Sequence, residues 1–582
     1  MSVILGLNCE HADSAACLII DNKILIAIEE ERISRIKHHY GFPFNAIQHC
    51  LNFAKLKIED VDLVAVNSDP KANLISKINY ILTNPVSLKL AFARILKSRK
   101  KSLKKNLRKI GYKKQIKFVE HHLSHITSSY SVSKLKNSVV LSVDGFGDFT
   151  SVAWGEAKNH KIKIRKRILF PNSMGIFYSA VTQHLGFLNY GDEYKVMGMS
   201  SYGSDIYKNK LKDLISFSED GSLRLKLKYF NHHKQNYFDI KKNVVKINPL
   251  FSDEIENILG IKRNPNDKVL QKHFDIARSL QEIYEEYMIN LVKYLKNKYP
   301  DHNNICLAGG CINNSLANGK ISNSEIFENV FICISPGDSG GAIGAAINAS
   351  KFSSFQFNGF SGSTYSNEQI KNYLNEKSDF LIKNNIKYSF LDEEQLITNT
   401  VEKLLDNKII GWFSGRMEFG PRALGNRSII CNPGMLNARS ELNEKIKLRE
   451  TFRPFAGSVL ESHKNEWFEC PTNEISPFMS KVYKVKGEKK KIIPSIVHND
   501  GTCRIQTVNI DDNRRYFNLI TKFFEKSKIP ILLNTSFNEN EPIVNSPLDA
   551  LECFNRTNMD YLVIENYFFQ KDNVNSTSKN NA

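Results

Sequence analysis

The 582-residue sequence lacks the marks of a secreted or membrane-spanning protein. Its first residues, MSVILGLNCEH, contain no basic stretch followed by an apolar core, so no secretory signal is indicated. No apolar run is long enough to cross a bilayer. The ten cysteines show no paired short spacings, which argues against a zinc ribbon and a disulfide framework. These absences predict a cytoplasmic protein with reduced thiols and no membrane partner.

Acidic residues are missing from one long stretch. None occurs between Asp69 and Glu120, whereas residues 89–117 contain thirteen Lys or Arg and carry much of the formal net charge of +19. Such a stretch suits a nucleic-acid or anionic surface. The competing interpretation is a solvated insertion, and the Lys- and Asn-rich character of the whole chain favours it. Nucleic acid is therefore not the expected partner.

One succession of strands occurs twice in the first part of the chain. An apolar strand, a polar loop and a hairpin are predicted in each copy, over residues 2–8, 15–21 and 23–32, and again over 138–144, 150–157 and 162–170. Two copies indicate an internally duplicated α/β domain, as in the actin-like fold. In that fold, the loops after the first strand of each half face a common cleft.

Two strand–loop–helix units follow, over residues 303–321 and 330–346. Their glycine-rich loops present backbone N–H groups at a helix start, which suits phosphate or nucleotide. A Ser-, Gly- and Phe-rich stretch then breaks the pattern. These features predict a first domain, a linker, a second α/β domain and a disordered tail, at residues 1–352, 353–366, 367–571 and 572–582.

Two histidines and two aspartates are candidate metal ligands. His121 and His125 are four residues apart, so on a helix they face the same way. Asp144 ends the repeated strand, and Asp338 lies in the PGDSGG loop. Two imidazoles and two carboxylates suit iron(II), manganese or zinc rather than calcium. The alternatives are a polar helix start and a turn aspartate. His122 points elsewhere on such a helix and is given no metal role.

Several motifs occur in order along nearly the whole chain, from about residue 3 to 570: H-x-x-x-H, DGFGD, YKVMGMSSYG, AGGCINNSLANGK, SPGDSGGA, GRMEFGPRALGNRS and KLRETFRPFAGSV. Together they resemble the NodU/CmcH family of O-carbamoyltransferases. One departure concerns the usual H-D-A-S motif, which is here His11-Ala12-Asp13-Ser14. The acid is displaced by one position, so Asp13 is assigned no role.

The resemblance implies an actin-like (ASKHA, threonylcarbamoyl-transferase-like) domain that binds Fe2+ or another divalent transition metal, followed by a YrdC-like α/β domain. It implies ATP and carbamoyl phosphate as co-substrates, with Mg2+ accompanying ATP. Carbamoyl-adenylate would form in the second domain and pass its carbamoyl group to an acceptor hydroxyl in the first. The acceptor would be a sugar or natural product, as in antibiotic, toxin or nodulation-factor synthesis. Its identity and the oligomeric state, a homo-oligomer included, stay open.

Two other functions compete. Both halves resemble domains that build threonylcarbamoyladenosine on tRNA, so nucleic-acid modification is the alternative enzyme function. A metal-stabilised scaffold without catalysis is the third, and the intact arginine-rich motifs argue against it.

Basic and small polar residues of the second domain are expected to bind the anionic co-substrates. Guanidinium groups suit several negative charges gathered in one pocket, and Gly and Pro prevent a continuous helix in the first motif. Surface basic residues are the alternative. The candidates with catalytic or ligand-binding roles are Arg416, Arg422, Lys447 and Arg449, with Arg427 and Arg453 nearby. Those expected to bind nucleotide are His498, Arg504, Asn534 and Ser536.

Four residues of the first domain complete the candidate set. By family position, Gly310 and Asn314 contact carbamoyl-adenylate, and Lys37 lies near the same intermediate. An exposed lysine at a helix end is the alternative for Lys37. His11 is a candidate general base, because an imidazole with a pKa near 6.5 can accept a proton at neutral pH. Structural hydrogen bonding is the alternative for His11.

Overall fold

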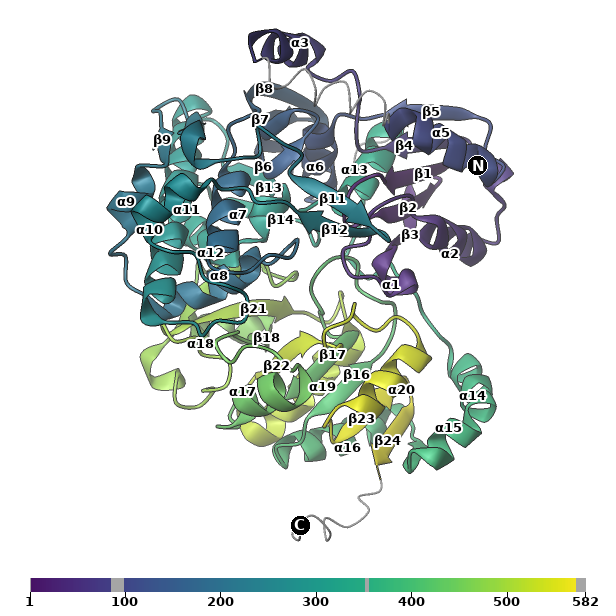
Figure 1. The fold of residues 1–582 in the computed structure, drawn as a ribbon. Coiled ribbons are helices and arrows are strands. Elements are labelled where there is room, and N and C mark those ends of the chain that lie inside the picture. The colour runs from purple at the N-terminus through teal and green to yellow at the C-terminus, as the bar shows by residue number, and fades with distance from the viewer. Residues whose placement is uncertain (1, 85–98, 351–354, 572–582) are drawn as a thin grey trace.

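Two five-stranded sheets with matching strand order form the first unit of the computed structural model (Figure 1). The orders are β3-β2-β1-β4-β5 and β8-β7-β6-β13-β14. In each sheet the three strands of the predicted repeat pair antiparallel, and the two further strands pair parallel. The predicted duplicated, actin-like topology is therefore confirmed. The strands are β1 (Val3–Asn8), β2 (Ala15–Ile20), β3 (Lys23–Glu29), β4 (Leu63–Val66), β5 (Gln115–Phe118), β6 (Asn137–Gly147), β7 (Thr150–Lys158), β8 (Lys161–Leu169), β13 (Asn304–Ala308) and β14 (Asn329–Ile332).

The structure describes residues 2–84, 99–350 and 355–571. The tail predicted to be disordered, 572–582, lies outside the described residues, as does part of the basic stretch.

Two helices, α6 (His121–Tyr130) and α13 (Gly340–Ala349), pack against each other, and α13 lies on β1. Glycine makes both contacts close: a Cβ on Gly344 would lie 1.8 Å from the Ser124 carbonyl oxygen, and one on Gly6 would lie 2.1 Å from that of Ala342. This packing brings the start of α6 to the carboxyl end of β6. The other long helices of this unit are α2 (Phe44–Ala54), α3 (Leu74–Thr83), α5 (Arg99–Lys109), α7 (Met174–His184), α8 (Glu193–Met199), α11 (Gln271–Lys298) and α12 (Ser315–Asn323).

Separate apolar cores stabilise the two halves. One buries the first sheet against α2 and α5, and the larger one buries the second sheet against α7, α8 and α11. Short elements between α7 and α11, which the sequence did not predict, add to the second half. They are η2 (Ser200–Tyr202), α9 (Lys208–Lys212), β9 (Ile215–Phe217), β10 (Leu223–Leu225), η3 (Leu227–Tyr229), β11 (Phe238–Lys241), β12 (Val244–Ile247), η4 (Asp253–Ile255) and α10 (Glu256–Leu259).

A ten-stranded mixed sheet forms the second unit, which confirms the expected α/β class. Its order is β15-β24-β23-β16-β17-β22-β18-β21-β20-β19. Helices α16 and α19 share one core with the sheet, and α17 and α20 share another. The elements are α14 (Asn367–Glu376), α15 (Ser378–Lys383), β15 (Ile386–Phe390), α16 (Glu393–Leu405), β16 (Ile410–Phe413), β17 (Arg427–Cys431), α17 (Ala438–Ser440), β18 (Ala456–Leu460), β19 (Phe468–Glu469), β20 (Lys481–Val485), β21 (Thr502–Val508), α19 (Arg514–Ser527), β22 (Ile531–Ser536), α20 (Pro547–Arg556), β23 (Tyr561–Ile564) and β24 (Tyr567–Lys571).

The two units make close contact where α12 meets β20. A Cβ on Gly319 would lie 1.9 Å from the Val482 carbonyl oxygen, so the helix and strand approach backbone to backbone. Beside this contact, buried Lys481 pairs with Glu474 at 2.6 Å and donates to the Val330 carbonyl at 2.9 Å. The units therefore share a tightly packed junction.

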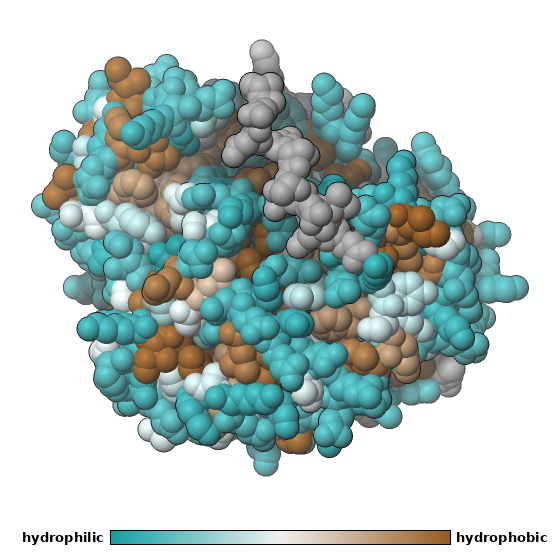
Figure 2. All heavy atoms as spheres, turned by 90° about the horizontal axis from the view of Figure 1, so that it is seen from below, coloured by the Kyte–Doolittle hydropathy of each residue, from teal (hydrophilic) through white to brown (hydrophobic). Residues whose placement is uncertain are grey.

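Hydrophilic residues cover most of the molecular face shown in Figure 2, and hydrophobic residues form small separate patches there. Among the described residues, no helix has the length and apolar composition needed to cross a membrane.

Candidate active site

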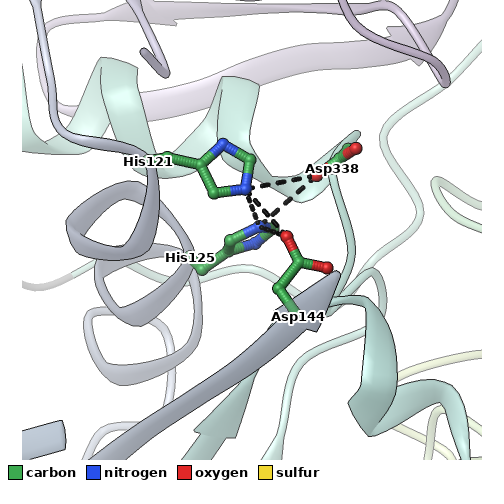
Figure 3. Close-up of side chains that lie close together, drawn as sticks. All are labelled: His121, His125, Asp144 and Asp338. Atoms are coloured by element: carbon green, nitrogen blue, oxygen red, sulfur yellow. Dashed lines mark hydrogen bonds and ion pairs between the residues drawn. The ribbon is translucent and has the colours of Figure 1, made fainter. Parts of the chain in front are cut away.

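His121, His125, Asp144 and Asp338 converge on one point of the first unit (Figure 3). The Glu120 side chain accepts from the backbone N–H groups of His122 and Leu123 and so starts α6 at His121. The first turn of this helix therefore directs both imidazoles toward Asp144 on β6 and toward Asp338 in the loop before α13. The structure thus brings the four predicted ligands together from both halves of the duplicated domain.

Short distances join the four groups. His121 Nε2 lies 2.9 Å from Asp144 Oδ2 and 2.9 Å from His125 Nε2. His125 Nε2 lies 3.5 Å from both Asp144 Oδ2 and Asp338 Oδ1. The imidazoles are fully buried, and the carboxylates are about one-tenth exposed. One side of the cluster therefore reaches the surface through its oxygens.

Nearby backbone groups make room for the His121 ring and hold the cluster by hydrogen bonds. A Cβ on Gly147 would lie 1.9 Å from the His121 ring, so only glycine leaves room for this imidazole. The Gly310 N–H donates to Asp144 Oδ1 at 3.0 Å, and the His121 N–H donates to Asp148 Oδ2 at 2.9 Å. These contacts fix the orientation of His121 and Asp144.

Burial and charge oppose each other within the cluster. Burial lowers the pKa of His125, but the carboxylates of Asp144 and Asp338 outweigh it and raise the pKa to about 10. Burial alone would raise the pKa of Asp144, yet hydrogen bonds from His121 and His125 hold it well below its ordinary value. The four groups therefore form a charge-paired set.

The donor set fits a divalent transition metal. Its four ligand atoms lie within 4.8 Å of one another, and nitrogen with carboxylate oxygen suits iron, manganese or zinc. Asp338 Oδ1 is buried, and among the described residues it has no hydrogen-bond partner. A cation would satisfy that oxygen. Which metal binds stays a prediction.

The neighbouring histidines differ in their contacts. His122 Nδ1 lies 2.8 Å from Ser142 Oγ and its Nε2 lies 3.0 Å from the Thr150 carbonyl oxygen, so this ring faces the sheet. His11 stacks on His121 with ring centres 5.3 Å apart, and its Nδ1 lies 3.7 Å from Asp338 Oδ2. The candidate general base is therefore adjacent to the cluster.

Lys37 is exposed, whereas its neighbour His38 lies in an interaction that sequence reasoning missed. His38 Nδ1 is 2.8 Å from Asp13 Oδ1, and these residues form a group with Glu31. The displaced acid of the H-A-D-S motif was the only signal in the sequence. It did not reveal a partner 25 residues away.

A cluster of guanidinium groups lies in the second unit where it faces α8. Burial lowers the pKa of Arg504 well below its ordinary value, and the charges of Arg422, Arg449 and Arg453 add to this effect. Burial also lowers the pKa of Arg422 to about 10 and that of Arg449 to about 9. Among the described residues, only Arg453 of these four has a carboxylate partner, Glu450 at 3.6 Å. Guanidinium groups gathered with so few carboxylate partners have the charge and hydrogen-bond donors that suit an anion, and an anion-binding role stays a prediction.

Two arginines of the same motif have structural contacts instead. Arg416 Nη2 donates to the carbonyls of Leu25 and Ser361 at 2.8 and 2.7 Å. Arg427 is fully buried, stacks on Phe413 at 3.6 Å and donates to backbone carbonyls. The sequence could not separate these from the clustered arginines, because all lie among glycine and apolar residues. A ligand role for Arg416 stays a prediction.

The first unit also holds the segment before Arg422. The Gly420 N–H donates to Glu29 Oε1 at 2.5 Å, and Arg32 Nη2 donates to the Gly420 carbonyl at 2.7 Å. Together with Arg416, these bonds attach the residue 416–422 loop to β3 and the helix that follows it.

Lys447 is buried at the end of β22. Its Nζ donates to the backbone carbonyl of Ser536. It also donates to the backbone carbonyl and to the side-chain Oδ1 of Asn538, both at 2.7 Å. Burial, then the charge of Arg449, lowers its pKa well below the ordinary value. The predicted residues Lys447 and Ser536 are therefore hydrogen-bonded to each other.

The remaining nucleotide candidates occupy hydrogen-bonded positions. Asn534 Nδ2 donates to Ser458 Oγ at 2.9 Å, while its buried Oδ1 has no partner among the described residues. Both ring nitrogens of His498 have partners, Thr502 Oγ1 and the Phe455 carbonyl, each at 3.1 Å. Ligand roles for these residues stay predictions.

Residues 310–316 connect the two clusters. Gly310 contacts Asp144, and Asn314 caps α12 and exchanges hydrogen bonds with Gln281 at 2.8 and 2.9 Å. Ser315 and Leu316, next along the chain, line a cavity of about 20 Å³ together with Arg504. A single short segment thus runs from the carboxylate cluster to the guanidinium cluster.

Comparison with known proteins adds two family matches. Residues 3–347 match the model described as Carbamoyltransferase N-terminus, and residues 401–571 match Carbamoyltransferase C-terminus. The uncharacterized protein sll1178 of Synechocystis sp. is 34% identical over 98% of this chain and 97% of its own length. The nodulation protein NolNO of Sinorhizobium fredii is 32% identical over 96% of this chain and 79% of its own. NolO of Bradyrhizobium diazoefficiens is 34% identical over 78% of this chain and 79% of its own.

Proposed function

Because this chain belongs to the carbamoyltransferase family and is a transferase, we propose that it is an O-carbamoyltransferase that uses ATP and carbamoyl phosphate. One observation carries the proposal: a guanidinium cluster almost without carboxylate partners adjoins a buried imidazole–carboxylate cluster across residues 310–316. The first suits polyanionic co-substrates, Mg2+ accompanying ATP, and the second suits group transfer.

The reaction would proceed in two steps. In the second unit, water would cleave carbamoyl phosphate to carbamate and phosphate, and a carbamate oxygen would then attack the α-phosphorus of ATP, giving carbamoyl-adenylate and releasing pyrophosphate. Arg422, Arg449 and Arg504 would hold the phosphates, and Gly310 and Asn314 would contact the adenylate in the first unit. An acceptor oxygen then attacks the carbamoyl carbon, and AMP leaves. When bound to His121, His125, Asp144 and Asp338, a divalent metal supplies Lewis-acid polarisation.

The acceptor would be a small molecule with a hydroxyl group. The alternative, modification of tRNA, depends on the basic residues 89–117, part of which lies outside the described residues. The match of both units to carbamoyltransferase models supports a small molecule as the acceptor.

Separating the two half-reactions tests the proposal. Arg504→Gln should lose the pyrophosphate burst from ATP and carbamoyl phosphate while keeping its metal content. His125→Ala should lose metal and keep the burst. Arg165→Gln, an exposed arginine on β8 that pairs with Glu156, is the matched control and should retain both. Loss of the same half-reaction in the Arg504 and His125 variants would overturn the division of roles.

A further inference from the structure

Asp13 and His38 form an imidazole–carboxylate pair beside the four-ligand cluster. His38 Nδ1 lies 2.8 Å from Asp13 Oδ1, and each side chain is 29% exposed. Both residues have positive φ, 53° for Asp13 and 54° for His38, a backbone region that is uncommon for residues other than glycine but that aspartate and histidine adopt more readily than most. The His38 N–H donates to Glu31 Oε2 at 2.8 Å and helps hold this conformation. Strained residues held by their surroundings are typical of functional sites.

Tyr190 connects this pair to the four-ligand cluster. Its ring meets His38 edge to face, with centres 5.4 Å apart. Burial raises the pKa of the Tyr190 hydroxyl well above its ordinary value, and the charges of Asp338, Asp13 and Asp144 raise it further. The Tyr190 hydroxyl is therefore close enough to interact electrostatically with Asp13 of the pair and with Asp144 and Asp338 of the four-ligand cluster. Asp13 also shares the β1–β2 loop with His11, which contacts the cluster directly.

The second nitrogen of His38 is open to a ligand. Among the described residues, Nε2 has no hydrogen-bond partner, and it faces Gly191. A Cβ on Gly191 would lie 3.0 Å from Nε2, so a side chain there would crowd this nitrogen, and the His38 side chain is 29% exposed. The pair thus has a carboxylate that holds Nδ1–H and an Nε2 that is free to accept a proton.

We propose that Asp13 and His38 act as an acid–base pair, in which His38 Nε2 takes the proton of the acceptor hydroxyl as its oxygen attacks the carbamoyl carbon. This inference rests on the proposed function. The new bond joins the acceptor oxygen to the carbamoyl carbon, and the bond from that carbon to the phosphate oxygen breaks. The electron pair leaves with AMP, and the proton passes from His38 to solvent. Asp13 keeps the imidazole in the tautomer that accepts at Nε2.

The surroundings of His38 set the pH at which it would work. Burial lowers its pKa, and Asp13 and Glu31 outweigh this and raise it above the ordinary value, while Lys37 opposes them. Glu193 and Tyr190 are the titratable groups that face it from the other side. A base must be unprotonated, so the transfer rate should rise with pH through a midpoint above 6.5.

His11 is the competing base, and one variant separates the two. Asp13→Asn removes the charge that raises the His38 pKa, so the midpoint for transfer should move to lower pH. A midpoint that stays in place would contradict His38 as the base.

The test follows pyrophosphate and AMP separately, with ATP, carbamoyl phosphate, the metal-loaded full-length protein, and water or glycerol as acceptor. His38→Gln should keep the single-turnover pyrophosphate burst and lower AMP release by about 100-fold or more. His160→Gln, an exposed histidine in the turn after β7, is the matched control and should behave as the wild type. Asp13→Asn, at a side chain that is 29% exposed, provides the pH readout even if His38→Gln folds poorly.

Each outcome is decisive. Unchanged AMP release in His38→Gln, joint loss of burst and AMP release in a folded variant, or an unshifted midpoint in Asp13→Asn overturns the inference. A wild-type protein without a pyrophosphate burst contradicts the proposed function itself, and the inference falls with it.

Discussion

At the scale of single residues, His121 and His125 link stability to pH. Without metal, the raised pKa of His125, about 10 against 6.5 for an ordinary histidine, means that the folded state binds more protons between these values. This stabilisation is complete below pH 6.5 and is lost as the pH rises through about 10. The chelator-treated protein should therefore lose free energy of unfolding from pH 6.5 to 9.5, measured by urea titration.

Metal should reverse that trend, because it needs neutral imidazoles and competes with the protons. In His125→Ala the chelator-treated protein should show a weaker pH dependence. An equal slope in variant and wild type would contradict the assignment of this effect to His125.

Arg504 illustrates the opposite arrangement, a buried cation among cations. Removing it in Arg504→Met relieves repulsion with Arg422, Arg449 and Arg453, so the free energy of unfolding should rise by about 1 kcal/mol. Pyrophosphate should stabilise the wild type against heat and have little effect on the variant. A less stable Arg504→Met protein that still responds to pyrophosphate would be inconsistent with an anion site there.

The sequence was enough to find the four clustered ligands. The i, i+4 spacing indicated the histidines, and the family resemblance favoured the two aspartates as their partners over the alternative of a turn aspartate. Arg416 and Arg422 could not be told apart in the same way, because their difference lies in contacts with Leu25 or with Arg504, far away in the chain. The Asp13–His38 pair was missed for the same reason.

At the scale of elements, the end of β6 decides whether the ligands can meet. Gly147→Ala would place a methyl group 1.9 Å from the His121 ring, so the ring must move and bound metal should fall by about tenfold or more. Gly145→Ala, two residues earlier on the same strand, meets nothing within 4 Å and is the matched control. Metal content by elemental analysis should separate the two, and equal occupancy would refute the steric argument.

Strands with apolar residues were predictable from sequence, and the repeats at β1–β3 and β6–β8 match the expected ranges closely. Strands β4 and β5 were not assigned, since LVAV is a very short apolar run and the more exposed QIKF lacks a clear period. Their parallel pairing depends on contacts that no local pattern encodes.

At the scale of the whole molecule, the contact of α12 with β20 should couple the half-reactions. Gly319→Ala forces the two backbones apart, which should cost about 1–3 kcal/mol in unfolding free energy. It should also lower AMP release while the pyrophosphate burst persists. Gly487→Ala, in open space on the second unit, is the control. Equal loss of burst and AMP release in Gly319→Ala would argue against separate sites.

The sequence indicated two units but not how they join. Backbone-to-backbone contact at Gly319 and the buried Lys481–Glu474 pair involve residues that look ordinary in isolation. Their importance appears only when both units are folded.

The bonds from Leu25, Glu29 and Arg32 to the 416–422 loop have a consequence for protein engineering. A C-terminal half that is expressed alone, or joined to the N-terminal half of a relative, would lose these hydrogen bonds, which hold the 416–422 loop in its conformation. Chimaeras joined between the two units should therefore need β3 and the helix that follows it to come from the same parent as the 416–422 loop.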